Sequence, residues 1–222
     1  MAIDSAAKLG DRRIPRLFME NPIRRLFQPH QKLVSKYISA GNVVADLGCG
    51  PGYFTLPIAK VVGDSGRVYA VDFDPRAIER VKNKAAKYGY GSVIEAHVSS
   101  ASDVDFIARD SVDLVFANGL LCCMKDHVGA VRQIARILKP EGRAYLSITK
   151  SSRKNDQRTV IKDEWRKLLL GSFEILDEGE GFASRWALLS KRSKDETHSP
   201  GRYEAGEEYR NGDAQFTGCI CR

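Results

Sequence analysis

The chain has 222 residues, a formal net charge of +7 and a hydrophobic fraction of 43%, which is enough for one well-buried domain. It contains no run of about 18 apolar residues and no signal-peptide stretch, which argues against a membrane span or export and favours a cytoplasmic location. The five cysteines are too scattered for a disulfide framework, so reduced thiols are expected.

Strands and helices are expected to alternate along the middle of the chain. β-Branched and aromatic runs predict strands, and apolar residues at helical spacing predict helices. The expected strands cover 42–48, 66–73, 92–98, 111–118, 142–149, 173–179 and 184–190, and the expected helices cover 54–63, 75–89, 127–139 and 159–171. Too few residues separate the last two strands for a crossover connection, so the final strand is expected to be antiparallel.

This βαβ succession predicts an α/β fold with a doubly wound, mostly parallel sheet and helices on both faces. Asp74 and Asp126 stand where side chains cap the helices that follow them. The buried face of helix 127–139 is expected to consist of Val128, Val131, Ala135 and Leu138.

The chain is expected to have three parts: an N-terminal helical lid or extension at 1–42, a body at 43–190 and a polar, flexible tail at 191–222. The first part holds eight Lys and Arg against three Asp and Glu, whereas the rest of the chain is close to balance. This favours an anionic partner or a lid contact near the N-terminus, with a solvated helix face as the alternative.

A glycine-rich turn, DLGCGPG, follows the first predicted strand, and such a turn between strand and helix usually holds a nucleotide. A Walker loop would need a lysine after the glycines, but the chain continues with Tyr53, which excludes ATP hydrolysis of that type. A dinucleotide fingerprint would need its third glycine at this same position, which disfavours NAD and FAD. The loop alone therefore predicts a nucleotide-type ligand without identifying it.

Four segments, in the right order, resemble class I S-adenosylmethionine-dependent methyltransferases. They are DLGCGPG, VYAVDFDP, SVDLVFANGLL and RQIARILKPEGRAYLSI, and the resemblance covers about residues 30–190. It implies a Rossmann-like, seven-stranded sheet, S-adenosyl-L-methionine as the cofactor and S-adenosyl-L-homocysteine as the product. No metal is expected.

The same resemblance assigns the cofactor site. Gly48, Gly50 and Gly52 let the backbone approach the cofactor without Cβ clashes. Asp72 is expected to accept hydrogen bonds from the ribose hydroxyls. Asp46 is expected to order the loop, to contact the amino end of the cofactor or to cap loop amides. The other expected cofactor contacts are Cys49, Tyr53, Phe73, Ser100, Ala101 and Asn118.

One position departs from the family pattern. Many members carry an aspartate after the third strand that accepts from the adenine amino group, and Ser100 stands there in this chain. A serine forms a hydrogen bond without charge, so adenine recognition is expected to be weaker or displaced to another residue.

The acceptor is expected to be a small molecule. The chain lacks the NPPY motif of amine and nucleic-acid base methylation; the matching strand ends in ANGLL. The alternatives are an RNA or protein methyltransferase that uses the basic N-terminal segment, and a non-catalytic cofactor-binding protein. Residues 14–40 are the candidate cover of the acceptor pocket, and residues 12–28 are a candidate for peripheral membrane contact.

No catalytic residue is assigned, although His30 and His127 are candidates for a general base. Cys122 and Cys123 follow the fourth predicted strand, where core packing is the favoured interpretation. The alternative is that these adjacent thiols hold a soft metalloid, which would indicate arsenite methylation. Cys219 and Cys221 are too isolated for a zinc site. The sequence assigns no oligomeric state.

Overall fold

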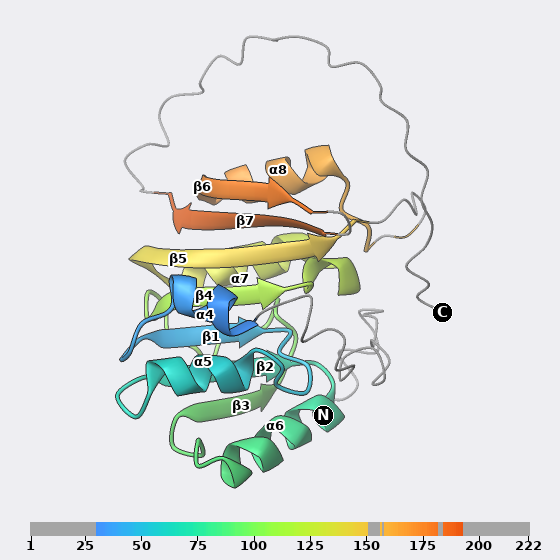
Figure 1. Ribbon diagram of the computed structural model, residues 1–222. Helices are drawn as coiled ribbons and strands as arrows, with labels where there is room; N and C mark the ends of the chain where they lie inside the picture. Colours follow the sequence, from blue (N-terminus) through green and yellow to red (C-terminus); the bar gives the residue numbers. More distant parts are fainter. Residues whose placement is uncertain (1–29, 151–155, 157, 182–183, 193–222) are drawn as a thin grey trace. The chain divides into compact units, whose positions relative to one another are not determined.

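The computed structural model describes residues 30–150, 156, 158–181 and 184–192 (Figure 1). Its seven-stranded sheet has the order β3-β2-β1-β4-β5-β7-β6. The strands are β1 Val43–Leu47, β2 Arg67–Asp72, β3 Ile94–Val98, β4 Val112–Asn118, β5 Leu138–Thr149, β6 Phe173–Glu180 and β7 Ser184–Lys191. β1 to β5 pair in parallel, and β7 runs antiparallel to both β5 and β6. The predicted sheet, including its antiparallel final strand, is confirmed.

Helices cover both faces of this sheet (Figure 1). The described helices are α4 His30–Tyr37, α5 Thr55–Val62, α6 Pro75–Lys87, the short 3-10 helix η1 Leu121–Cys123, α7 His127–Ile137 and α8 Lys162–Leu170. One apolar core lies between the sheet and α4, α5 and α6, and the other lies between the sheet and α7 and α8. This is the doubly wound arrangement that the alternating sequence predicts.

None of the helices in the described ranges has the length and apolarity that crossing a membrane requires.

Two predicted helix starts are confirmed in atomic detail. The Asp74 carboxylate accepts from the Arg76 amide at 3.1 Å, and a proline occupies the first turn of α6. The Asp126 carboxylate accepts from the Gly129 amide at 2.8 Å at the start of α7. Each cap satisfies an amide that has no partner inside its helix, which fixes where the helix begins.

The predicted buried face of α7 is wrong in part. Val128 is 59% exposed, and Leu138 is the first residue of β5 and not part of the helix. The side chains that α7 buries are Ala130, Val131, Ile134 and Ile137. The helix ends early because Leu138 already pairs with Val112 of β4, so β5 begins four residues before its predicted start at 142.

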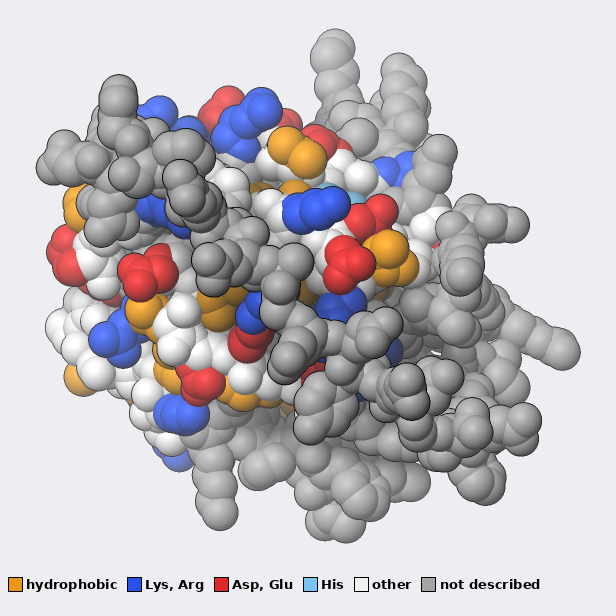
Figure 2. All heavy atoms as spheres, turned by 90° about the horizontal axis from the view of Figure 1, so that it is seen from above, with side chains coloured by type: hydrophobic (Ala, Val, Ile, Leu, Met, Phe, Trp, Pro, Cys, Tyr) orange, Lys and Arg blue, Asp and Glu red, His pale blue; other side chains and the backbone are white. Residues whose placement is uncertain are grey.

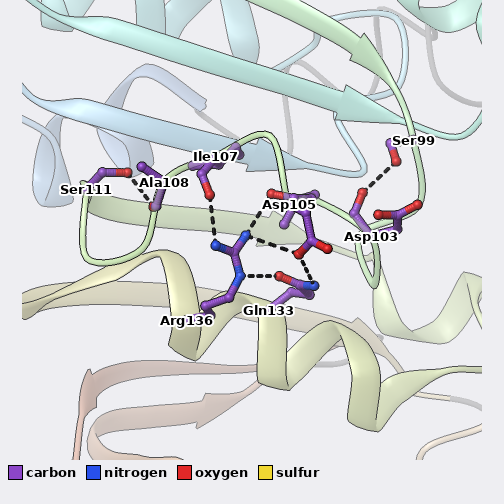
Figure 3. Close-up of polar contacts among 9 residues, drawn as sticks. Ser99, Asp103, Asp105, Ile107, Ala108, Ser111, Gln133 and Arg136 are labelled. Atoms are coloured by element: carbon purple, nitrogen blue, oxygen red, sulfur yellow. Dashed lines mark hydrogen bonds and ion pairs between the residues drawn. The ribbon is translucent and has the colours of Figure 1, made fainter.

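The connection from β3 to β4 contains turns but no helix. Arg136 of α7 fastens this loop, donating from Nη2 to the Val104 carbonyl at 2.8 Å and from Nη1 to the Ile107 carbonyl at 2.9 Å. Its Nε donates to the Gln133 side-chain oxygen, and the Gln133 amide in turn donates to the Asp105 carboxylate. Figure 3 shows the Arg136 guanidinium between the Ile107 carbonyl, the Asp105 side chain and Gln133. One arginine therefore satisfies carbonyls that a crossover helix would satisfy internally.

α4 is the first described element of the N-terminal part. Val34 and Ile38 are buried in the same core as α5 and α6. Residues 1–29 and 193–222 lie outside the described residues, so the predicted boundaries at 42 and 190 stay predictions.

Candidate functional site

The candidate site lies where the strand order reverses. β1 is flanked by β2, which follows it in the chain, and by β4 on its other side. In open α/β sheets, ligands bind beside the carboxyl ends of the strands at such a switch point. The glycine loop, Asp72 and Asn118 all stand at this edge, toward which the β1 and β4 arrows point in Figure 1.

The glycine loop requires its glycines. Gly48, Gly50 and Gly52 have φ angles of +74°, +53° and +87°, a region that residues with a Cβ seldom adopt. The amides of Gly48 and Cys49 both donate to the Val71 carbonyl of β2, at 2.8 and 3.0 Å. The alternating left-handed residues thus produce a tight turn fixed to the neighbouring strand.

The Asp72 carboxylate at the end of β2 joins the loop to the next connection. Its Oδ2 accepts from the Gly50 amide at 2.8 Å, and its Oδ1 accepts from the Asp74 amide at 2.9 Å. A carboxylate has about four lone-pair sites, so these bonds are compatible with acceptance from ribose hydroxyls as well. The structure therefore brings two predicted site residues, Gly50 and Asp72, into direct contact.

Asp46 lies beneath the loop and is only 2% exposed. Its Oδ2 accepts from the Thr55 hydroxyl at 2.6 Å, which ties the end of β1 to the first residue of α5. Burial raises the pKa of Asp46 to about 7, the negative charge of Asp72 adds to the rise, and the Thr55 bond opposes it. Among the expected roles, loop ordering agrees with this geometry, but the partner is a hydroxyl that the sequence reasoning missed.

The exit of the loop is held by aromatic packing and a lysine. Tyr53 is half-buried and packs edge-to-face on Phe54, with ring centroids 4.9 Å apart. Phe54 in turn contacts Phe116 of β4, at 4.8 Å between centroids. Lys84 of α6 donates to the Pro51 carbonyl at 2.7 Å. These contacts hold the loop in place between two helices and a strand.

Asn118 ends β4 and is held by a second residue that the sequence reasoning missed. The Ser147 hydroxyl of β5 donates to Asn118 Oδ1 at 2.8 Å and accepts from the Gly119 amide at 3.1 Å. Asn118 and Ser147 are paired residues in the β4–β5 ladder. Each of the two predicted strands has a polar residue near its end, but the sequence does not give the register that pairs the two residues.

Ser100 and Ala101 follow β3 and lie beside the Asp72 strand end, because the preceding Ser99 amide donates to the Asp72 carbonyl at 3.0 Å. The Ser100 hydroxyl pairs with the Ser102 hydroxyl at 2.9 Å, and Ala101 is buried. The position that differs from the family pattern therefore has a neutral hydroxyl that is already hydrogen-bonded.

The remaining candidates receive less support. Cys49 lies in the glycine loop after β1, and its side chain is buried. Phe73 lies in the connection from β2 to α6 and is half-buried. His127 begins α7, and its buried Nε2 has no hydrogen-bond partner among the described residues. His30 begins α4, but its side chain is outside the described set. The described residues include no cluster of three or more His, Cys, Asp or Glu side chains that could hold a metal ion.

The strand order, the glycine loop and the acid at the end of β2 define a class I S-adenosylmethionine-dependent methyltransferase fold. The sequence pattern of the methyltransferase-domain family matches residues 38–177, and the chain belongs to this family. A solved S-adenosylmethionine-dependent methyltransferase from Aquifex aeolicus superimposes with a TM-score of 0.68 at 19% identity, covering 86% of this chain and 98% of that one.

Two curated relatives are named for small-molecule substrates. The aklanonic acid methyltransferase of Streptomyces sp. (strain C5) is 37% identical over 103 residues, which is 46% of each chain. The demethylmenaquinone methyltransferase of Bacillus velezensis is 28% identical over 121 residues, covering 52% of this chain and 51% of the relative. The chain thus matches about half the length of these curated relatives.

Proposed function

We propose that this protein transfers a methyl group from S-adenosyl-L-methionine to a small-molecule acceptor. The observation that carries the proposal is the hydrogen bond from the Gly50 amide to the Asp72 carboxylate. It places a carboxylate that can accept hydrogen bonds from ribose hydroxyls beside a glycine loop that has no Walker lysine. The cofactor contains no phosphate, so a loop without a cationic side chain suits it.

Each site residue has a defined part in this proposal. Asp72 would hold the ribose, Ser100 and Ala101 would lie along the adenine, and the loop glycines would let the protein backbone approach the cofactor closely. Asn118, oriented by Ser147, would border the methionine end. The proposed contacts also include Asp46, Cys49, Tyr53 and Phe73. When bound, the cofactor supplies an activated methyl on a sulfonium, and the protein holds the acceptor in line with it.

Two observations support a small acceptor. The two curated relatives are named for aklanonic acid and demethylmenaquinone, both of which are small molecules. Figure 2 shows acidic and basic side chains interspersed among the described residues of one face, whereas a nucleic-acid backbone is bound by clustered Lys and Arg side chains. RNA, protein and non-catalytic binding are the competing outcomes.

The cofactor proposal is tested by calorimetry with S-adenosylmethionine and S-adenosylhomocysteine. Asp72→Ala should weaken binding of both ligands at least about tenfold, because hydrogen bonds to a charged acceptor contribute roughly 1.5–3 kcal/mol. Asp113→Ala is the matched control: this carboxylate accepts from the Val43 amide at 2.8 Å, at the amino end of β1. Equal affinities in Asp72→Ala and the control would remove Asp72 from the site.

The acceptor proposal is tested by a screen with labelled S-adenosylmethionine against metabolite, RNA and protein fractions. Transfer to the metabolite fraction alone is expected. Label in RNA or protein would replace the small-molecule proposal, and binding without transfer to any fraction would favour a non-catalytic role.

The N-terminal segment is proposed to cover the acceptor. Deleting residues 1–28 should then abolish transfer to a small acceptor while circular dichroism of the body stays unchanged. This segment lies outside the described residues, so its contact with an acceptor or a membrane surface stays a prediction. Activity that survives the deletion would contradict the proposal that this segment covers the acceptor pocket.

A further inference from the structure

Two adjacent thiols stand at the edge of the candidate site. Cys122 and Cys123 are the last residues of η1, just after the carboxyl end of β4, and neither forms a disulfide. Both are half-buried, whereas the flanking Leu121 and Met124 are buried. The turn is therefore anchored by its apolar neighbours, and the two sulfurs remain at the margin of the core instead of inside it.

The Cys122 sulfur has hydrogen-bond partners for both its protonated and its deprotonated form. Hydrogen bonding from the Cys123 thiol, and to a lesser extent from the amide and hydroxyl of Thr149, lowers the pKa of Cys122, although burial opposes this effect. In its protonated form the same thiol donates to the Gly119 carbonyl at 3.2 Å. Because the thiolate is the form that binds metals and metalloids, these donors prepare Cys122 as a ligand.

Cys49 provides the contrast within the same protein. It is buried in the glycine loop, and burial, reinforced by the negative charges of Asp46 and Asp72, raises the pKa of its thiol. Among the described thiols, the two on η1 are therefore the partly accessible ones, whereas Cys49 is buried as an apolar side chain.

We propose that Cys122 and Cys123 form a dithiol site for a trivalent, thiophilic metalloid of the arsenoxide class. The proposal goes beyond methyl transfer and does not depend on it. Each sulfur forms one bond to arsenic, the arsenic–oxygen double bond breaks, and the oxygen leaves with the two thiol protons as one water. Neither arsenic nor sulfur changes its oxidation state, so no oxidant or reductant is needed.

The number and type of ligands select this class. The described residues offer no third His, Cys, Asp or Glu in the cluster, whereas a structural zinc ion wants four ligands. Thiolates prefer soft centres, and a trivalent arsenical with one organic substituent needs only two sulfurs. A disulfide between the same residues would require a sulfur–sulfur separation of about 2.05 Å, whereas a bridging metalloid holds the sulfurs farther apart.

The position of the pair links it to the cofactor edge. Leu120 precedes η1, and its Cδ1 lies only 2.9 Å from where a Cβ on Gly48 would stand. The turn that carries the thiols thus packs directly against the glycine loop. A bound metalloid would therefore lie beside the proposed methyl-donor site.

The test uses full-length protein with Cys219→Ser and Cys221→Ser, because these tail thiols form a second potential dithiol outside the described residues. Titration with phenylarsine oxide, followed by intact-mass spectrometry without cofactor, should give one adduct per chain. Cys122→Ser and Cys123→Ser should each weaken binding about 100-fold or more, since the second bond of a chelate is intramolecular. Cys49→Ser, the matched control, should bind like the background protein.

A second measurement guards against variants that fail to fold. In the background protein, phenylarsine oxide should protect Cys122 and Cys123 together from iodoacetamide, as mapped on peptides, and leave the reactivity of Cys49 unchanged. Protection of neither or only one of the two thiols, or an unchanged affinity in the Cys122→Ser/Cys123→Ser variant, would overturn the proposal. Because no step requires S-adenosylmethionine, failure here leaves the proposed methyltransferase function standing.

Discussion

Replacing Asp46 with asparagine should change how the stability of this protein depends on pH. The folded protein holds a proton on Asp46 up to about pH 7, whereas the unfolded chain, with the ordinary value of 3.8, releases it near pH 4. The free energy of unfolding of the wild type therefore falls as pH rises through this window and stays lowered above it. An asparagine side chain carries no charge and keeps an oxygen for the Thr55 hydroxyl, so the substitution removes this contribution.

The pKa difference sets the size of the effect. A rise of roughly three units, at about 1.36 kcal/mol per unit, corresponds to about 4 kcal/mol as an upper bound. Relative to the wild type, Asp46→Asn should thus gain up to about 4 kcal/mol between pH 4 and pH 8.5. The side chain is almost fully buried, so solvent screening reduces this value little.

The assay is urea unfolding without cofactor at several pH values across that range. Asp64→Asn is the matched control, because this carboxyl group is exposed in the turn after α5. The Asp46→Asn difference from the wild type should grow with pH, and the control difference should stay nearly constant. If the difference in unfolding free energy between Asp46→Asn and the wild type did not change with pH, the raised pKa of the buried Asp46 would be refuted.

Two further substitutions test the loops of the site. Gly48→Ala should lower the unfolding free energy by about 1–3 kcal/mol in urea denaturation, because its φ of +74° is left-handed and its new Cβ would meet Leu120 at 2.9 Å; an unchanged value would show that the loop relaxes freely. Arg136→Met should cost about 2–4 kcal/mol and speed hydrogen exchange in residues 99–111, because two carbonyls lose a charged donor. Arg143→Met, at an exposed position, should change neither the unfolding free energy nor the hydrogen exchange. Equal exchange in the two variants would contradict the proposed role of Arg136 in holding this loop.

Features governed by local chemistry could be predicted from the sequence. Alternating glycines at 48, 50 and 52 predict a glycine-rich turn between a strand and a helix, and in the structure all three have positive φ angles. Asp74 and Asp126 indicate helix starts because a side-chain acceptor satisfies otherwise unpaired amides. In each case the cause lies within a few residues of its effect.

Features governed by distant pairing could not be predicted. Ser147 reaches Asn118 because of the β4–β5 register, which shifts between Val112 and Leu114. The predicted face of α7 is wrong in part because Leu138 continues the helical spacing but belongs to the strand. Periodicity cannot distinguish the last turn of a helix from the first residues of a strand that follows directly.

The helix-free crossover between β3 and β4 has a consequence for how this protein can evolve. Ala101, Val104 and Ile107 of that loop are buried in the core shared with α7 and α8. The stretch proposed to lie along the adenine is therefore also part of the protein's structural interior. A sequence change that alters which nucleoside is accepted there must preserve the packing beneath it, so ligand preference and heat resistance should vary together across variants of this segment.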